Sequence, residues 1–372
     1  MNWTQKRLAD VVELRRGFDL PHPQRRDGVV PVLSAGQAVG RHDTAMVKGP
    51  GFAIGRATNL GAPVWSDVDY WPLNTTLYAA DFKGNDPRFL YWLFQVTDLT
   101  GYDSGSVQPM LNRNYIAKVE VSLPPVGEQR AIAEVLGALD NAIAAARRVA
   151  QSCLRLADAC FGEALGTSTV ATATYGDVAA IGGGGTPSTT VAEYWDGDIA
   201  WVTPTDVTQL DLPYLAETSR TLTSEGARAS SSPLYPEGSI LMTSRATIGA
   251  FALAMAPTTV NQGFIVVQAR ADADRWWLLH EMQGRVDYYK SHANGATFLE
   301  LPRSRFKDLS VRWPDEATRT AFSQRVAPLH WRAYASSVSS KRLAALRDAL
   351  LPELMSGRMR VKDAEQRVEE AI

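Results

Sequence analysis

Residues 123–165 read LPPVGEQRAIAEVLGALDNAIAAARRVAQSCLRLADACFGEAL, and this stretch decides the fold. It opens on Pro124-Pro125, and proline can stand before a helix but not inside one. Apolar or small residues recur every seven positions, at Ile132, Leu139, Ala146, Cys153 and Cys160. A second set lies three positions further on, at Val135, Ala142, Val149 and Leu156. This stripe predicts a long helix that packs along another long helix.

A second long helix is predicted near the other end of the chain, over residues 315–350. The same spacing recurs there, at Phe322, Leu329, Ser336, Leu343 and Leu350. Pro328 lies inside this stretch, and because proline lacks an amide donor we expect it to kink or interrupt the helix. The two helices can serve as a spacer within one chain or as an oligomerisation surface between chains.

The two helical stretches belong to an internal duplication. Residues 105–124 align with residues 295–314 at a constant offset of 190, and the alignment continues into both helices. Nearer the start of each copy the offset is 167, which pairs residues 9–11 with residues 176–178. Insertions therefore lie in the second copy before residue 295. The duplication favours the spacer within one chain, because the chain supplies both helices.

The repeat divides the chain into five parts. They are a globular domain at 1–124, a long helix at 125–168, a second globular domain at 169–314, a second long helix at 315–350 and a tail at 351–372. Apolar runs bounded by Gly and Pro predict short strands in both domains. Residues 87–96 and 275–283 predict short buried helices. We therefore predict an α/β (α+β) fold of two domains separated by two long antiparallel helices that form a coiled coil.

Composition excludes several classes of protein. Apolar residues make up 45% of the 372 residues and charged residues 21%, which is typical of a soluble globular protein. No apolar run approaches the roughly 20 residues that span a bilayer, and no signal-peptide core begins the chain. We therefore expect a cytoplasmic protein. Cys153 and Cys160 lie too far apart on one helix for a disulfide and are interpreted as small apolar residues of the seam.

Sequence motifs of common enzymes are missing. The chain has no Gly-Lys pair, which excludes a P-loop, and it has no HExxH or GxSxG motif. The glycine run 182–185 is followed by Thr186-Pro187 and is interpreted as a turn or hinge. Because the histidines are scattered and no CxxC is present, we expect no metal site. We predict that this chain has no catalytic residues and binds no cofactor.

The first helix carries a specific motif. Residues 124–143 read PPVGEQRAIAEVLGALDNAI, which fits the pattern PP-x-x-EQR-x-IA-x-VL-x-x-LD-x-x-I. This motif, the order of domain and helix, and the ending LLPELMSG at 350–357 resemble the specificity (S) subunit of type I restriction-modification systems. The second copy departs from the motif, since Thr318-Arg319-Thr320 replaces Glu128-Gln129-Arg130.

The resemblance implies a function and a set of partners. Subunits of that family read a bipartite site on double-stranded DNA, one half-site per domain, and their helices set the unread spacer. They have no catalysis of their own. They recruit methylation (M) subunits, which use S-adenosylmethionine, and a restriction (R) subunit, which uses ATP and Mg. No membrane partner is implied, and phage defence is the expected setting.

Candidate DNA-binding residues come from basic and polar clusters, because Arg and Lys neutralise phosphates and Arg or Asn reads base edges. The candidates are Arg16, Arg41, Lys48, Arg56, Arg113, Asn114, Arg245, Thr247, Arg303, Ser304 and Arg305. Arg113 and Arg303 are related by the repeat, and we expect both in loops that precede a strand. Each candidate can equally be a solvated surface residue, since the net charge is only −2.

Three alternatives remain open from the sequence. The chain can serve a methylation-only system or a related phage-defence system instead of a complete restriction system. It can also be a self-contained methyltransferase, against which the missing motifs count, or a coiled-coil scaffold that does not bind DNA.

Overall fold

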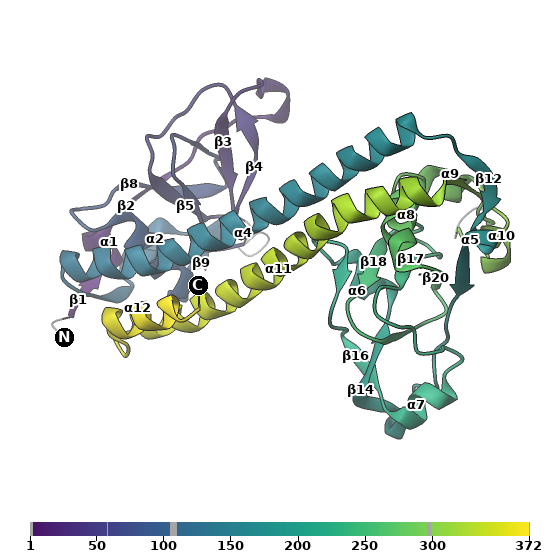
Figure 1. Cartoon of the computed structure of the whole chain (residues 1–372). Coiled ribbons are helices and arrows are strands. Elements are labelled where there is room, and N and C mark those ends of the chain that lie inside the picture. Colours follow the sequence, from purple (N-terminus) through teal and green to yellow (C-terminus); the bar gives the residue numbers. More distant parts are fainter. Residues whose placement is uncertain (1–2, 58, 105–109, 296–298, 372) are drawn as a thin grey trace. The chain divides into compact units, whose positions relative to one another are not determined.

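The computed structural model describes residues 3–57, 59–104, 110–295 and 299–371 (Figure 1). Parts of the aligned repeat, residues 105–109 and 296–298, lie outside the described residues. The chain forms two compact units, which we call the first unit (residues 1–145 and 339–372) and the second unit (146–338). Two long helices, α4 (Val126–Thr167) and α11 (Glu316–Met355), each contribute one part to both units. The predicted fold class is confirmed.

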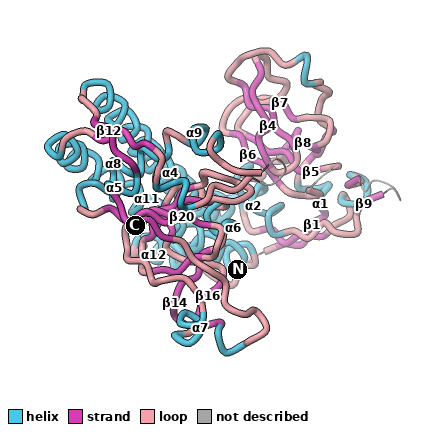
Figure 2. Tube along the Cα trace, turned by 90° about the vertical axis from the view of Figure 1, so that its right-hand side faces the viewer, coloured by secondary structure: helices cyan, strands magenta, loops and turns pink. Residues whose placement is uncertain are grey.

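The first unit contains two small sheets and two short ribbons. Its four-stranded antiparallel sheet has the order β2-β8-β5-β6, and its three-stranded sheet has the order β4-β3-β7. Figure 2 shows these strands gathered beside helix α2. The elements are β1 (Thr4–Arg7), α1 (Leu8–Val11), β2 (Glu13–Arg16), η1 (His22–Gln24), β3 (Val30–Ser34), β4 (Gln37–His42), β5 (Gly51–Gly55), β6 (Pro63–Ser66), β7 (Trp71–Pro72), β8 (Thr76–Asp81), α2 (Pro87–Val96), β9 (Asp103–Ser104), β10 (Met110–Leu111), α3 (Arg113–Ile116), β11 (Glu120–Leu123) and α12 (Val361–Glu369).

The second unit repeats this plan with additions. Its larger sheet has the order β13-β20-β17-β18-β15, and its smaller sheet has the order β16-β14-β19. The elements are β12 (Ala171–Thr174), α5 (Tyr175–Val178), β13 (Ala179–Gly182), η2 (Ala192–Tyr194), β14 (Trp195–Val202), α6 (Pro204–Thr208), β15 (Tyr214–Leu215), β16 (Arg220–Leu222), α7 (Ser224–Ala229), β17 (Ile240–Thr243), β18 (Phe251–Ala254), β19 (Thr258–Val260), β20 (Phe264–Ala269), α8 (Asp272–Gln283), α9 (Val286–Ser291), α10 (Arg303–Lys307) and β21 (Ser310–Trp313).

The strand pairings of the first domain recur at equivalent positions in the second domain. The first strand of each domain pairs antiparallel with its last strand, with Thr4 opposite Leu123 and Ala171 opposite Trp313. These pairs reproduce the sequence offsets of 167 and 190. In each smaller sheet the central strand has one antiparallel and one parallel neighbour. The two domains are therefore copies of one scaffold, with β15 added to the second.

A buried aromatic helix anchors the core of the first unit. Helix α2 starts at Pro87, where the missing amide of proline costs no hydrogen bond, and the Asp86 carboxylate accepts from the Phe89 amide. Its apolar side chains pack with strands β5 and β8 and with the halves of α4 and α11 that belong to this unit. The predicted helix at 87–96 is confirmed. Its counterpart α8 starts at Asp272, three residues before the predicted start.

The start of α4 is locked to the first domain by Gln129, which is buried. Its side-chain carbonyl accepts from the Asp86 amide, and its Nε2 donates to Asn85 Oδ1 and to the Pro124 carbonyl, each at 3.0 Å. Both amide hydrogens and the carbonyl oxygen of the side chain thus have partners, which offsets the cost of burying an amide. The motif residue Gln129 therefore has a structural role.

Arg319 takes the same place in the second unit. Its Nη1 donates to the Pro314 carbonyl at 2.5 Å, as Gln129 does to Pro124, and its Nε binds Asp274 Oδ1 at 2.6 Å. Its guanidinium carbon lies 4.2 Å from the ring centroid of Trp313. Both copies therefore fix the start of the long helix through the residue at this position, and we call this contact the lock. In the first copy it is made by an amide, and in the second by a guanidinium in an ion pair.

The helix seam differs from the predicted heptads in one part. Val149 and Leu156, which were predicted to be buried, are 36% and 51% exposed, and Ala150 and Ala157 are buried instead. Along α4 the buried residues Leu136, Ile143, Ala150 and Ala157 keep the seven-residue spacing, and each lies one residue after a position of the predicted set. The predicted period is therefore right, and in the second half of α4 the buried positions are shifted by one residue from the predicted ones. On α11, the predicted positions Phe322, Ser336, Leu343 and Leu350 are buried.

Two further features of the C-terminal part differ from the sequence-based expectation. The helix α11 runs without a break through Pro328, so the predicted interruption is wrong. A proline inside a helix removes one hydrogen bond, and the side chains of Val326 and His330 on either side of Pro328 are buried and hold the helix in place. Residues 351–371 contain the end of α11 and the helix α12, whose Ala364 and Val368 are buried in the core of the first unit. Among the described residues, no helix combines the length and apolar character needed to cross a membrane.

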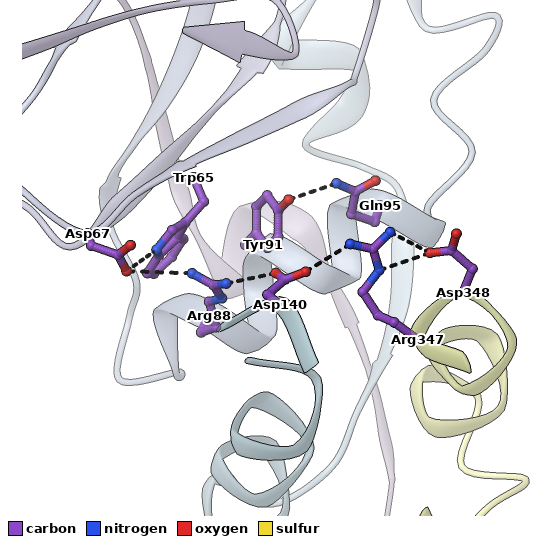
Figure 3. Close-up of polar contacts among 8 residues, drawn as sticks. All are labelled: Trp65, Asp67, Arg88, Tyr91, Gln95, Asp140, Arg347 and Asp348. Carbon is purple, nitrogen blue, oxygen red and sulfur yellow. Dashed lines mark hydrogen bonds and ion pairs between the residues drawn. The ribbon is translucent and has the colours of Figure 1, made fainter. Parts of the chain in front are cut away.

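Asp140 on α4 ties together three elements of the first unit (Figure 3). Its Oδ2 lies 2.9 Å from Arg88 Nη2 of α2, and its Oδ1 lies 2.8 Å from Arg347 Nη1 of α11. Arg88 also lies over the ring of Trp65, 4.6 Å from its centroid. The three charged side chains are only 19%, 22% and 26% exposed, so solvent screens their attraction less than at an open surface.

A chain of polar side chains, buried except for Asp158 at its end, ties together four elements of the second unit. His280 Nδ1 lies 3.0 Å from Asp158 Oδ1, and the Nε2 atoms of His280 and His330 lie 2.9 Å apart. His330 Nδ1 lies 2.9 Å from the hydroxyl of Tyr214. His330 is stacked on Trp276, with ring centroids 4.2 Å apart. Burial, and then the neighbouring His280, lowers the pKa of His330 to about 3, so this imidazole is neutral at pH 7.

Asp140→Ala should lower the free energy of unfolding by about 2 kcal/mol, because two partly buried guanidinium groups lose their shared acceptor. Chemical denaturation measures the change. Asp348→Ala is the matched control: Asp348 also pairs with Arg347 but is 63% exposed, so its loss should cost at most about 0.5 kcal/mol. Equal effects of the two substitutions would contradict the bridging role of Asp140.

Acidification should destabilise the second unit through His330. The unfolded imidazole binds a proton near pH 6.5, whereas the folded one does so near pH 3. The unfolded state therefore holds more protons between these values, and stability falls as the pH drops below about 6.5. The His330 share of the loss between pH 7 and pH 5 should be about 2 kcal/mol. Chemical denaturation of His330→Phe across this range should show a free energy of unfolding that depends less steeply on pH. The same pH dependence in a folded variant would contradict the role of His330.

Candidate nucleic-acid interface

Each domain has a hollow beside the short helix that precedes its last strand. The hollow in the first domain, called the first hollow, has a volume of about 350 Å³. It lies where the ends of β2, β5 and β10 meet the start of α3. Its lining residues are Arg16, Arg56, Leu77, Met110, Leu111, Asn112, Arg113 and Asn114. Four of the predicted site residues, Arg16, Arg56, Arg113 and Asn114, are therefore brought together.

Backbone contacts fix the first hollow. The Leu111 amide donates to the Arg56 carbonyl at 2.8 Å, which joins the segment after β5 to β10. The side chain of Asn112 then accepts from the Asn114 amide at 3.0 Å and caps α3. Arg113 is thus the first residue of a helix, which corrects the expectation that it lies in a loop. Its side chain is exposed beside the hollow.

The second domain repeats the hollow at equivalent positions. The Leu301 amide donates to the Ser244 carbonyl at 2.9 Å, as Leu111 does to Arg56, and Arg303 is the first residue of α10. This second hollow has a volume of about 490 Å³. It is lined by Ile181, Gly184, Ser244, Arg245, Gln262, Phe264, Glu300, Leu301, Pro302, Arg303, Ser304 and Lys307. The predicted residues Arg245, Arg303 and Ser304 meet here.

The two hollows differ in charge. The lining of the first holds three arginines and no acidic residue, and in the described part of the chain no ion pair engages Arg16, Arg56 or Arg113. The lining of the second holds Arg245, Arg303 and Lys307 but also an acidic residue, Glu300. Guanidinium, amide and hydroxyl groups of this kind can donate to phosphate oxygens and to base edges.

The other predicted residues lie outside the two hollows. Thr247 lines an adjoining hollow of about 330 Å³, which it shares with Arg245 and Gln262. Arg41 lies on β4, where its Nη1 donates to the Val29 carbonyl at 3.3 Å, and Arg305 is exposed on α10.

Lys48 is already neutralised at the surface. Its Nζ lies 2.6 Å from Asp69 Oδ2, and its side chain is 91% exposed. The hydrogen bond that the Lys48 ammonium donates to the Asp69 carboxylate raises the pKa of Lys48. Only some of the predicted basic and polar residues therefore line the two hollows.

Reasoning from basic clusters missed several lining residues. Met110 and Glu300 line equivalent edges of the two hollows, and Gln262 and Lys307 line the second. The offset of 190 pairs Met110 with Glu300, so the repeat itself carried the signal for this pair. A search for positive charge could not find it, because one member is apolar and the other is acidic. Among the described residues, no three His, Cys, Asp or Glu side chains are grouped so that they could hold a metal ion.

Comparison with known proteins gives a consistent result. The model of the family described as type I restriction modification DNA specificity domain matches residues 1–151 and 167–321. The MjaIX type I restriction enzyme specificity subunit of Methanocaldococcus jannaschii is 36% identical over 140 residues, which cover 37% of this chain and 32% of that protein. The HindI type I restriction enzyme specificity subunit of Haemophilus influenzae is 26% identical over 177 residues, or 47% and 38% of the two chains. The matched segments thus span about a third of the length of these curated relatives.

The fold has a solved counterpart. The S subunit of a type I restriction-modification system from M. genitalium superimposes with a TM-score of 0.71, covering 95% of this chain and 96% of that one. The identity is 14%, so the likeness concerns the fold.

Proposed function

This chain belongs to the family of type I restriction modification DNA specificity domains, and from that membership we propose that it is the DNA-reading subunit of a type I restriction-modification complex. The observation that carries the proposal is the pair of repeat-equivalent hollows. Each places an arginine, Arg113 or Arg303, at the start of a helix beside further cationic side chains. Arginine is the residue that binds phosphate and guanine edges with two parallel hydrogen bonds.

The duplication supports reading of a bipartite site, one half-site per domain. Both domains keep the same scaffold and differ in the residues that line the hollows and in the loops between strands. A shared scaffold with divergent loops suits two different targets. We assign phosphate contacts to the repeat-equivalent Arg113 and Arg303, because a contact that is retained in both copies suits the part of DNA that does not vary with sequence.

Chemistry is assigned to partner subunits. Methylation subunits would bring S-adenosylmethionine, and a restriction subunit would bring ATP and Mg; this chain would supply recognition without catalysis. Support comes from the family and from its named relatives, which are specificity subunits.

The proposal is tested by combining the chain with the methylation subunits of its host and sequencing the methylated DNA. We expect methylation at one bipartite sequence, which is lost when this chain is left out. Methyl transfer by this chain alone would show a self-contained methyltransferase, and absence of DNA binding with every partner would favour the scaffold. If unmethylated DNA that carries this site is not cut when a restriction subunit, ATP and Mg are added, the methylation-only system is favoured.

Arg113→Ala and Arg303→Ala should each weaken binding to specific and random duplexes by a similar factor. Each should also reduce the slope of log affinity against log salt by about one, because one phosphate contact is lost. Titration of both variants against both duplexes at several salt concentrations gives these values. Loss confined to one base pair of one half-site would instead assign base reading to that arginine.

Lys48→Ala serves as the control for this experiment. It removes one exposed positive charge of the first domain that Asp69 already neutralises and that lies outside the hollow. Its salt slope should equal that of the parent chain. A loss in this variant as large as that of Arg113→Ala would show that the effect follows total charge and not the hollow.

A further inference from the structure

A carboxylate holds one of the cations in the second hollow. Glu300 Oε1 lies 2.9 Å from Arg245 Nε and 2.8 Å from Arg245 Nη2. Both side chains are 46% exposed, so the pair faces solvent at the edge of the hollow and is accessible to a ligand.

The backbone brings the two residues together. Arg245 and Glu300 form an antiparallel bridge, which is continued by hydrogen bonds from the Ala246 amide to the Leu299 carbonyl and from the Leu301 amide to the Ser244 carbonyl. The carboxylate is therefore presented to the guanidinium by the fold, and side chains that pair across such a bridge face the same way.

The equivalent position in the first hollow is Met110, which carries no charge. The two copies of the scaffold therefore differ by a carboxylate at one lining position. Arg56 and Arg245 come from neighbouring positions of the repeat, since the carbonyl of Arg56 corresponds to that of Ser244. Within the described ranges no ion pair engages the arginines of the first hollow, whereas one cation of the second hollow is already paired.

We propose that Glu300 withholds Arg245 from the DNA backbone, so that the first domain supplies more of the sequence-independent affinity than the second. This inference rests on the proposed DNA-reading function. A phosphate that approaches Arg245 must displace the Glu300 carboxylate and is repelled by it. The second hollow therefore contributes less to the affinity for random-sequence DNA than the first hollow does. Stable engagement of the second domain then depends on contacts made by the correct bases.

The test gives each of the equivalent positions 110 and 300 the residue of the other, in two separate variants. In Glu300→Met, Arg245 is released, and affinity for a labelled random-sequence duplex should rise about threefold, the worth of an exposed ion pair. The salt slope should steepen by about one. In Met110→Glu, a carboxylate enters the first hollow, and both quantities should fall. Glu217→Met and Val29→Glu make the same changes of charge at exposed positions outside the hollows and should have much smaller effects.

A double variant shows whether the gain passes through Arg245. Glu300→Met combined with Arg245→Ala should bind random DNA no better than Arg245→Ala alone. A gain in Glu300→Met no larger than in Glu217→Met, or one that survives the loss of Arg245, overturns the inference. Unchanged binding to random DNA with weaker binding to the specific site also overturns it and assigns base reading to Glu300. If the parent chain binds no DNA with its methylation subunits, the proposed function fails; if it binds and the exchanges have no effect, only this inference fails.

Discussion

The pairing of the first strand of each domain with its last strand is the constraint on which the rest depends. β1 lies against β11 and β12 lies against β21, so each domain closes on itself just before its long helix begins. The short helices α3 and α10 are placed by the same closure, because each lies a few residues before that last strand. One set of backbone hydrogen bonds thus positions both the start of the long helix and the edge of the hollow.

The long helices are held to their units by polar contacts as well as by apolar packing. Gln129 and Arg319 fix the helix starts, and Asp140 and His330 fix positions further along. Buried polar groups add little net stability compared with apolar packing, but they accept few alternative arrangements. An apolar seam alone allows a helix to slide by a turn, whereas a fully paired amide or carboxylate does not.

Much of this architecture could be predicted from the sequence because periodicity and repetition are global signals. The two long helices, the duplication and the buried helix at 87–96 all follow from spacing. The exposure of Val149 and Leu156 could not be predicted, because each is followed directly by an alanine, Ala150 or Ala157, so that the heptad spacing fits the apolar residues at either of two neighbouring positions. The hollows were found only in part, since they are built by backbone contacts between segments remote in sequence, and the decisive pair, Met110 and Glu300, is not basic.

The lock at the helix start has a consequence for domain exchange between relatives. The groups that bind Gln129 belong to the segment before α2 and to Pro124, and those that bind Arg319 include Asp274 at the start of α8. A chimera joined at the end of β11 keeps the helix of one parent and the domain of the other. If the parents use different chemistries at this lock, an amide then faces a carboxylate, or a guanidinium faces an asparagine. The junction of a chimera is therefore best placed inside the long helix, after Gln129 or Arg319, so that each domain keeps the first turns of the helix that follows it.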